Sequence, residues 1–218
     1  EFGPRNPGSS GHLEFSNYLE GFLNQLDGNV IIQEFIYTEP ITSMERNGKN
    51  LIIQFNEDAE YRLLLGAHWD TRSLSDQDEV VDNQSLPVLG ANDGASGTSV
   101  LMELSTIISE KNPEIGIDIV FFDAEDGGFS GQPETFALGS KYFAENLPIA
   151  KPNFAIIVDM VGDKNLTIPI ERISYNIAPK KVKEIWNLAE ELSLPAFKKK
   201  IAQEIYDDHV PLWEIAEI

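Results

Sequence analysis

Side chains that can bind a divalent metal ion or move protons follow three apolar, strand-like stretches of the sequence and one turn. These are His68 after 62–67, Asp123, Glu125 and Asp126 after 117–122, Asp159 at the end of 154–158, and Asp93 in the turn before a helix predicted over 94–111. In an open α/β sheet, ligands bind in the crevice at the carboxyl ends of the strands. We therefore expect the imidazole and the carboxylates to meet at one edge of a sheet.

Several carboxylates that share a dry site repel one another, so either some of them are protonated or a cation lies among them. A mixture of imidazole nitrogen and carboxylate oxygen suits zinc, with ligand bonds of about 2.0–2.2 Å, whereas calcium and magnesium prefer oxygen alone. Taken singly, Asp93 could cap the following helix and His68 could be a hydrogen-bonded core histidine. Independent capping does not predict a shared edge, so the sequence favours a metal site.

The elements that would position these residues alternate between helices and strands. Apolar residues at helical spacing predict helices over 11–26, 94–111, 138–146 and 179–193, and strand-like runs occur at 29–37, 50–55, 62–67, 117–123, 154–162, 165–170 and 196–202. The runs 117–123 and 154–162 are nearly all apolar, which is typical of strands covered on both faces. The pattern predicts an α/β fold in three α/β/α layers, with a mixed, mostly parallel central sheet and a single domain over residues 1–218.

The composition narrows the classes of partner. The 218 residues include 16 Lys and Arg against 36 Asp and Glu, a formal net charge of −20. Nucleic acids and anionic membranes need a positive surface, so neither is an expected partner, whereas a metal ion or a substrate amine suits this charge. The chain has no cysteine, which excludes a thiolate metal site. No run approaches about 18 consecutive apolar residues, so no membrane-spanning segment is expected.

Five motifs in order resemble those of the zinc aminopeptidase and glutaminyl cyclase superfamily. They are "GAHWDTR", "GANDGASG", "FFDAEDGG", "VDMVGD" and "DDHVP", and the stretch "FGPRNPGSSGH" is similar to a signature near the start of such proteins. The resemblance implies the fold of zinc exopeptidases and one or two Zn²⁺ ions as the cofactor.

The resemblance also assigns roles to single residues. It implies that Asp93 is the central zinc ligand and that Asp126, where the family usually has Glu, is the next one. His68 and Asp159 match the ligands of a second zinc in the peptidases, and in the cyclases such residues form a hydrogen-bonding network. Glu125 matches the general acid and base, and Asp207 matches a carboxylate of the cyclase network, so Glu125, Asp159 and Asp207 are the expected catalytic residues.

One departure from the family concerns the remaining zinc ligand, a histidine in a "WHT"-like segment. That segment would follow residue 218, and His209 is not its equivalent because it belongs to "DDH". The expectation is that the C-terminal part of the domain is missing from the 218 residues, with one zinc ligand and a core strand.

The resemblance implies an enzyme that acts on the N-terminus of a peptide or protein. The stretch "GGFSGQPETFA" before "LGSKYF", together with "DDH", favours a glutaminyl-peptide cyclotransferase, which converts N-terminal glutamine to pyroglutamate and ammonia. A zinc aminopeptidase that cleaves the first peptide bond is the alternative, and a binding protein without catalysis is a further one. Export to the periplasm or the exterior is expected only by family analogy, and the sequence leaves the oligomeric state open.

Overall fold

The computed structural model describes residues 2–111 and 113–218 and divides the chain into two compact units. The first comprises the chain up to Val161 together with Asp207–Ile218, and the second is Gly162–Tyr206. The prediction that residues 1–218 form one catalytic domain stays a prediction.

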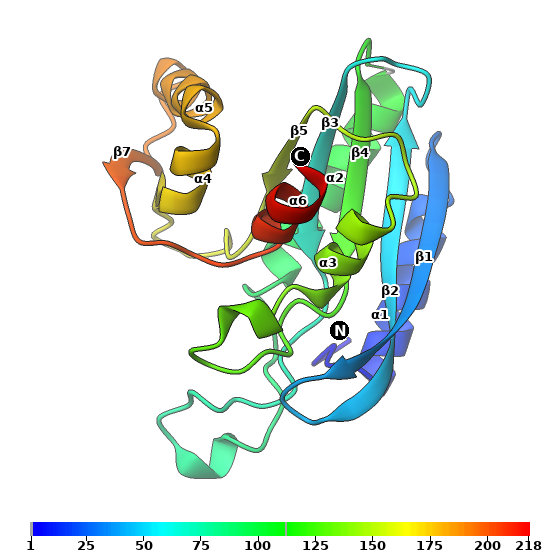
Figure 1. Ribbon diagram of the computed structural model, residues 1–218, viewed down its shortest axis with the longest axis vertical. Coiled ribbons are helices and arrows are strands. Elements are labelled where there is room, and N and C mark those ends of the chain that lie inside the picture. Colours follow the sequence, from blue (N-terminus) through cyan, green and yellow to red (C-terminus); the bar gives the residue numbers. More distant parts are fainter. Residues whose placement is uncertain (1, 112) are drawn as a thin grey trace. The chain divides into compact units, whose positions relative to one another are not determined.

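A five-stranded mixed sheet lies at the centre of the first unit (Figure 1), in the order β1-β2-β4-β3-β5. Its strands are β1 (Asn29–Glu39), β2 (Met44–Phe55), β3 (Arg62–His68), β4 (Gly116–Phe122) and β5 (Phe154–Ile157). β3 is parallel to both β4 and β5, whereas β2 is antiparallel to both β1 and β4. All strands except β2 therefore run in one direction, and their carboxyl ends lie at the same edge.

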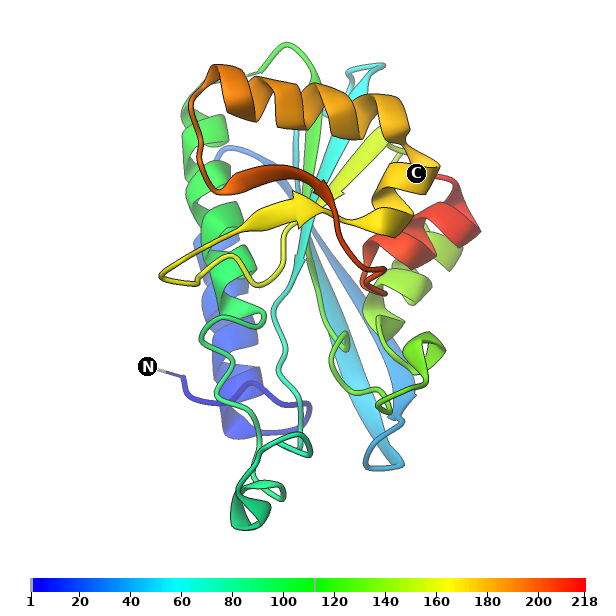
Figure 2. The same ribbon diagram turned by 90° about the vertical axis from the view of Figure 1, so that its left-hand side faces the viewer.

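Helices cover both faces of this sheet (Figures 1 and 2). α1 (Ser10–Leu23) and α2 (Ala95–Lys111) pack on one face, and α3 (Leu138–Glu145) and α6 (His209–Ala216) pack on the other. Strand side chains alternate between the two faces, so the sheet contributes to two cores. Ile53 and Phe121 belong to the core with α1 and α2, and Ile52 and Phe122 to the core with α3 and α6. The predicted three-layer α/β fold is confirmed.

Two strands with similar apolar sequences differ in burial. Every residue of β4 is buried, as predicted for a strand covered on both faces. The same prediction for 154–162 is wrong, because β5 ends at Ile157 and its residues are only half-buried. β5 lies at the edge of the sheet and pairs only with β3 among the described strands, and the sequence pattern does not report a strand's place in the order.

The second unit contains a two-stranded parallel sheet, β6 (Ile168–Ile170) with β7 (Phe197–Ile201), and the helices α4 (Arg172–Ile177) and α5 (Pro179–Glu191). The Glu171 side chain caps α4 by accepting hydrogen bonds from the N–H groups of Ile173 and Ser174. The described part of the first unit also has two short 3₁₀ turns, Val81–Asn83 and Pro133–Thr135. Over the described residues, no helix has the length and apolar character needed to cross a membrane.

Candidate metal and catalytic site

An imidazole and two carboxylates meet at the carboxyl edge of the central sheet. His68 Nε2 lies 2.9 Å from Asp93 Oδ1 and 3.3 Å from Asp159 Oδ1. One potential ligand atom from each residue lies within 4.8 Å of those of the other two. His68 ends β3, Asp93 precedes α2 and Asp159 follows β5, so the expected convergence of these three residues is confirmed.

Close packing between the end of β3 and the start of α2 brings His68 to Asp93. The Thr98 hydroxyl on α2 donates a hydrogen bond of 2.8 Å to the His68 carbonyl oxygen. A Cβ atom at Gly94 would lie 2.7 Å from His68 Nε2, closer than real side chains come. Glycine at position 94 therefore permits the contact between the turn and the imidazole.

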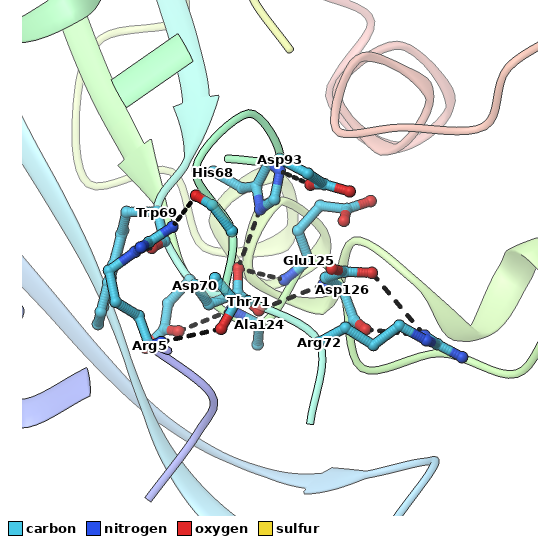
Figure 3. A network of polar contacts seen from close by, with 12 residues as sticks. Arg5, His68, Trp69, Asp70, Thr71, Arg72, Asp93, Ala124, Glu125 and Asp126 are labelled. Atoms are coloured by element: carbon cyan, nitrogen blue, oxygen red, sulfur yellow. Dashed lines mark hydrogen bonds and ion pairs between the residues drawn. The ribbon is translucent and has the colours of Figure 1, made fainter. Parts of the chain in front are cut away.

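The carboxylate of Asp70 connects the His68 ring to the loop after β4 (Figure 3). Its Oδ1 atom lies 3.3 Å from His68 Nδ1 and accepts a hydrogen bond of 3.1 Å from the Glu125 N–H. Its Oδ2 atom accepts a hydrogen bond of 3.2 Å from the Asp126 N–H. Asp70 thus orients the imidazole and holds the backbone of the two acidic residues, as outer partners of metal ligands do.

The electrostatics around His68 favour its charged form in the absence of an ion. Burial lowers the pKa of His68, but hydrogen bonds to Asp159, Asp70 and Asp93 outweigh burial and hold the pKa well above its usual value. Burial also opposes ionisation of Asp93, and the hydrogen bond and charge of His68 outweigh it, so the pKa of Asp93 is lowered.

Glu125 and Asp126 are buried and have raised pKa values. Burial raises the pKa of Glu125 well above its usual value, and the charges of Asp207, Asp208 and Asp126 add to the effect. Burial and the charge of Asp93 raise the pKa of Asp126 to about 8. A carboxyl group whose pKa is raised in this way can carry a proton at neutral pH, which a general acid and base requires.

Two arginines hold the loops beside this edge (Figure 3). Arg72 Nη1 donates a hydrogen bond of 2.9 Å to the Asp126 carbonyl oxygen, and Arg72 Nε donates one of 2.7 Å to Asp76. Arg5 Nε donates a hydrogen bond of 2.7 Å to the Trp69 carbonyl oxygen, and its Nη2 donates one of 2.8 Å to that of Gly90. The segments that flank His68 and Asp93 are therefore fixed to the N-terminal segment.

Asp207 precedes α6 and lies near Asp159, whose charge adds to burial in raising the pKa of Asp207. The neighbouring Asp208 is fully buried, and burial followed by the charge of Asp207 raises its pKa well above the usual value. The acidic groups of this region, Glu125, Asp126, Asp207 and Asp208, are all harder to ionise than in water. A cation among them would relieve this cost.

The donor set fits a metal ion. His68, Asp93 and Asp159 supply imidazole nitrogen and carboxylate oxygen, the ligand types of zinc. Asp126 is outside this group of three, although the charge of Asp93 acts on it. The metal roles of His68, Asp93, Asp126 and Asp159, and the catalytic roles of Glu125, Asp159 and Asp207, stay predictions.

Sequence reasoning did not assign a role to Asp70, Arg72 or Arg5. Asp70 had a usable signal, because side chains two residues apart on an extended segment point to the same side, so the carboxylate in "HWD" can reach the imidazole. Arg72 and Arg5 make contacts to backbone carbonyls far away in the sequence, and no local pattern marks such contacts.

Comparison with known proteins places this site in a family. The profile of peptidase family M28 matches residues 50–214. Among curated proteins, a glutaminyl-peptide cyclotransferase from Drosophila melanogaster is 23% identical over 168 residues, which cover 73% of this chain and 45% of that protein. The chain thus spans less than half the length of this relative.

Solved structures resemble the chain over its whole length. A glutaminyl cyclase from Bacteroides thetaiotaomicron is 34% identical with a TM-score of 0.95, and the match covers 100% of this chain and 77% of the other. A leucine aminopeptidase precursor from the same species is also 34% identical, with a TM-score of 0.94 and coverage of 100% and 78%. The family profile covers more than half of the chain, and the chain belongs to peptidase family M28.

Proposed function

We propose that the protein is a zinc-dependent glutaminyl-peptide cyclotransferase, which converts an N-terminal glutamine to pyroglutamate and releases ammonia. The observation that carries this proposal is the buried Glu125 carboxyl group, with its raised pKa, beside the His68, Asp93 and Asp159 group. The names of the Drosophila relative and of the Bacteroides cyclase support the reaction class.

Asp93 and Asp126 would hold one zinc ion, as the family resemblance implies. His68 and Asp159 would either bind a second ion together with Asp93 or remain a hydrogen-bonding network around it. A bound zinc ion would polarise the side-chain carbonyl of the substrate glutamine. Asp70 and Arg72 would keep His68 and the Asp126 backbone in place during turnover.

Glu125 is the proposed proton carrier. The α-amine nitrogen of the substrate forms a bond to the side-chain amide carbon, and the bond from this carbon to the amide nitrogen breaks. The Glu125 carboxylate accepts a proton from the attacking amine and delivers it to the departing nitrogen, which leaves as ammonia. Holding the amine and the amide close together supplies much of the rate advantage.

A zinc aminopeptidase is the second candidate, favoured by the 34% identity to the leucine aminopeptidase precursor. In that reaction Glu125 would take a proton from a water molecule that attacks the first peptide bond, and would give it to the leaving amine. Both reactions use the same carboxyl group, so products must separate them.

The test is incubation of the zinc-loaded protein with a peptide that begins with glutamine, followed by mass spectrometry. We expect loss of one ammonia from an uncut peptide. Release of a free N-terminal amino acid would establish the aminopeptidase. An unchanged peptide, with zinc bound to the protein, would indicate a binding protein without catalysis.

Matched variants test the role of Glu125. We expect Glu125→Gln to abolish turnover with unchanged zinc content, because the amide cannot carry the proton. Glu134→Gln removes an exposed carboxylate from the same segment between β4 and α3, and this variant should have wild-type activity. Wild-type activity of Glu125→Gln would remove the carboxyl group from the mechanism.

Export of the protein, expected from the family, is a separate proposal that fractionation of cells tests.

A further inference from the structure

His12, from the stretch "FGPRNPGSSGH", contacts Asp123, which lies two residues before Glu125. His12 is near the start of α1, where the Ser9 hydroxyl accepts a hydrogen bond of 3.1 Å from the His12 N–H. His12 is buried, with 10% of its side chain exposed. Its ring stacks on Trp69, with 4.4 Å between ring centroids and 29° between planes.

The imidazole binds a carboxylate 111 residues away. His12 Nε2 lies 2.9 Å from Oδ1 and 3.1 Å from Oδ2 of Asp123, which is completely buried. Burial lowers the pKa of His12, but the charge and hydrogen bond of Asp123 outweigh burial and raise it. The contact is therefore a charge-assisted one, which is stronger than a hydrogen bond between neutral groups.

Asp123 in turn fixes the backbone that leads to Glu125. Its Oδ1 accepts a hydrogen bond of 2.8 Å from the Ala124 N–H, and its Oδ2 accepts one of 2.8 Å from the Lys49 N–H. Ala124 has a φ of +57°, in the left-handed region that costs free energy for a residue with a Cβ atom. Such a turn persists only where its surroundings hold it.

Two carboxylates therefore hold three successive N–H groups of this loop. Asp123 accepts the hydrogen bond of Ala124, and Asp70 accepts those of Glu125 and Asp126. Asp70 has a partner in His68, and Asp123 has one in His12. Without His12, the buried Asp123 carboxylate would lose its cationic partner and would ionise less readily, so its hydrogen bond to the Ala124 N–H would weaken.

We propose that His12 is a positioning residue for Glu125, acting through Asp123 and the left-handed turn at Ala124. This inference rests on the proposed function for its effect on catalysis, and on the loop geometry alone for its effect on the backbone. His12 makes no contact with substrate in this role. It sets where the Glu125 carboxyl group lies when the proton moves.

The experiment compares His12→Ala with Leu23→Ala, which removes a fully buried side chain at the other end of α1 and destabilises this helix without touching Asp123. We expect His12→Ala to lower kcat by about tenfold to a hundredfold, as misplacement of a catalytic group does, with KM and zinc content unchanged. Leu23→Ala should keep the wild-type kcat below its unfolding temperature. His12→Gln places an amide donor near Nε2 and should recover part of the loss.

Amide hydrogen exchange tests the backbone effect without using activity. In His12→Ala the amides of residues 124–126 should exchange about tenfold faster, because roughly one charge-assisted hydrogen bond is lost. In Leu23→Ala they should exchange at the wild-type rate. Equal kcat losses in the two alanine variants, or unchanged exchange at 124–126 in both histidine variants, would overturn the inference. If the wild-type protein processes no peptide, the proposed function is refuted but the role of His12 is not. That role is then decided by the exchange rates of residues 124–126.

Discussion

Replacement of Asp70 by asparagine tests whether the buried carboxylate organises the site. Asp70 is completely buried and contacts His68 Nδ1 and the N–H groups of Glu125 and Asp126 at 3.1–3.3 Å. Asparagine keeps one oxygen but places an NH₂ group against one donor, so one buried hydrogen bond is lost and the charge disappears. The expected cost is about 2–4 kcal/mol of unfolding free energy, because hydrogen bonds to charged groups contribute roughly 1.5–3 kcal/mol each and an unsatisfied buried donor adds to the loss.

The same substitution should weaken zinc binding by about 10- to 100-fold, as loss of an outer partner of a ligating histidine does. Urea unfolding gives the stability change, and competition with a chelating dye gives the zinc affinity. The matched control is Asp118→Asn, at an equally buried carboxylate that accepts hydrogen bonds from Arg62 and Gln54 at the opposite end of β4. It should cost stability and leave zinc affinity unchanged. Equal zinc affinities for the two variants would refute the reasoning.

Three further perturbations have definite expected outcomes. Gly94→Ala should lower zinc affinity in a calorimetric titration, because its Cβ would meet His68, while urea unfolding shows that the chain still folds. Arg62→Met should cost about 3–5 kcal/mol in urea unfolding, because it leaves a buried carboxylate without its cation, and the double variant with Asp118→Leu should recover most of the loss. Burial opposes ionisation of Glu171, but hydrogen bonds from backbone N–H groups outweigh burial and lower the pKa of Glu171. The ionised carboxylate therefore stabilises α4 fully at a pH above 4.5, the ordinary pKa of glutamate, and this stabilisation is lost as the pH falls through the lowered pKa. Glu171→Gln should therefore speed amide exchange in α4 at neutral pH but not at acidic pH, and an equal effect at both would contradict the assignment.

Much of the fold follows from local patterns. Apolar residues at helical spacing locate α1, α2 and α5 to within a few residues, because the face of a helix that packs on a sheet must be apolar. Apolar runs locate β3 and β4, the leucines of 63–65 in β3 and the β-branched and aromatic residues of 117–122 in β4, because strands covered on both faces must be apolar. No bounds are predicted for α6, although Trp213 has the spacing of a helical stripe, because "HVPLWEIA" is short and contains a proline, which is tolerated only in the first turn.

The sequence by itself determined which kinds of side chain lie at this edge of the sheet, because the residue types and their places at the ends of apolar runs imply that an imidazole and carboxylates share it. Only the tertiary structure decided which of them touch. It brought His68 to Asp93 and Asp159, left Asp126 outside this group and gave Asp123 a partner in His12. These contacts join residues far apart in the chain, and their geometry depends on strand order and on how α1 and α2 pack. Local spacing carries no information about either, since it reports which face of an element is buried and not what that face meets.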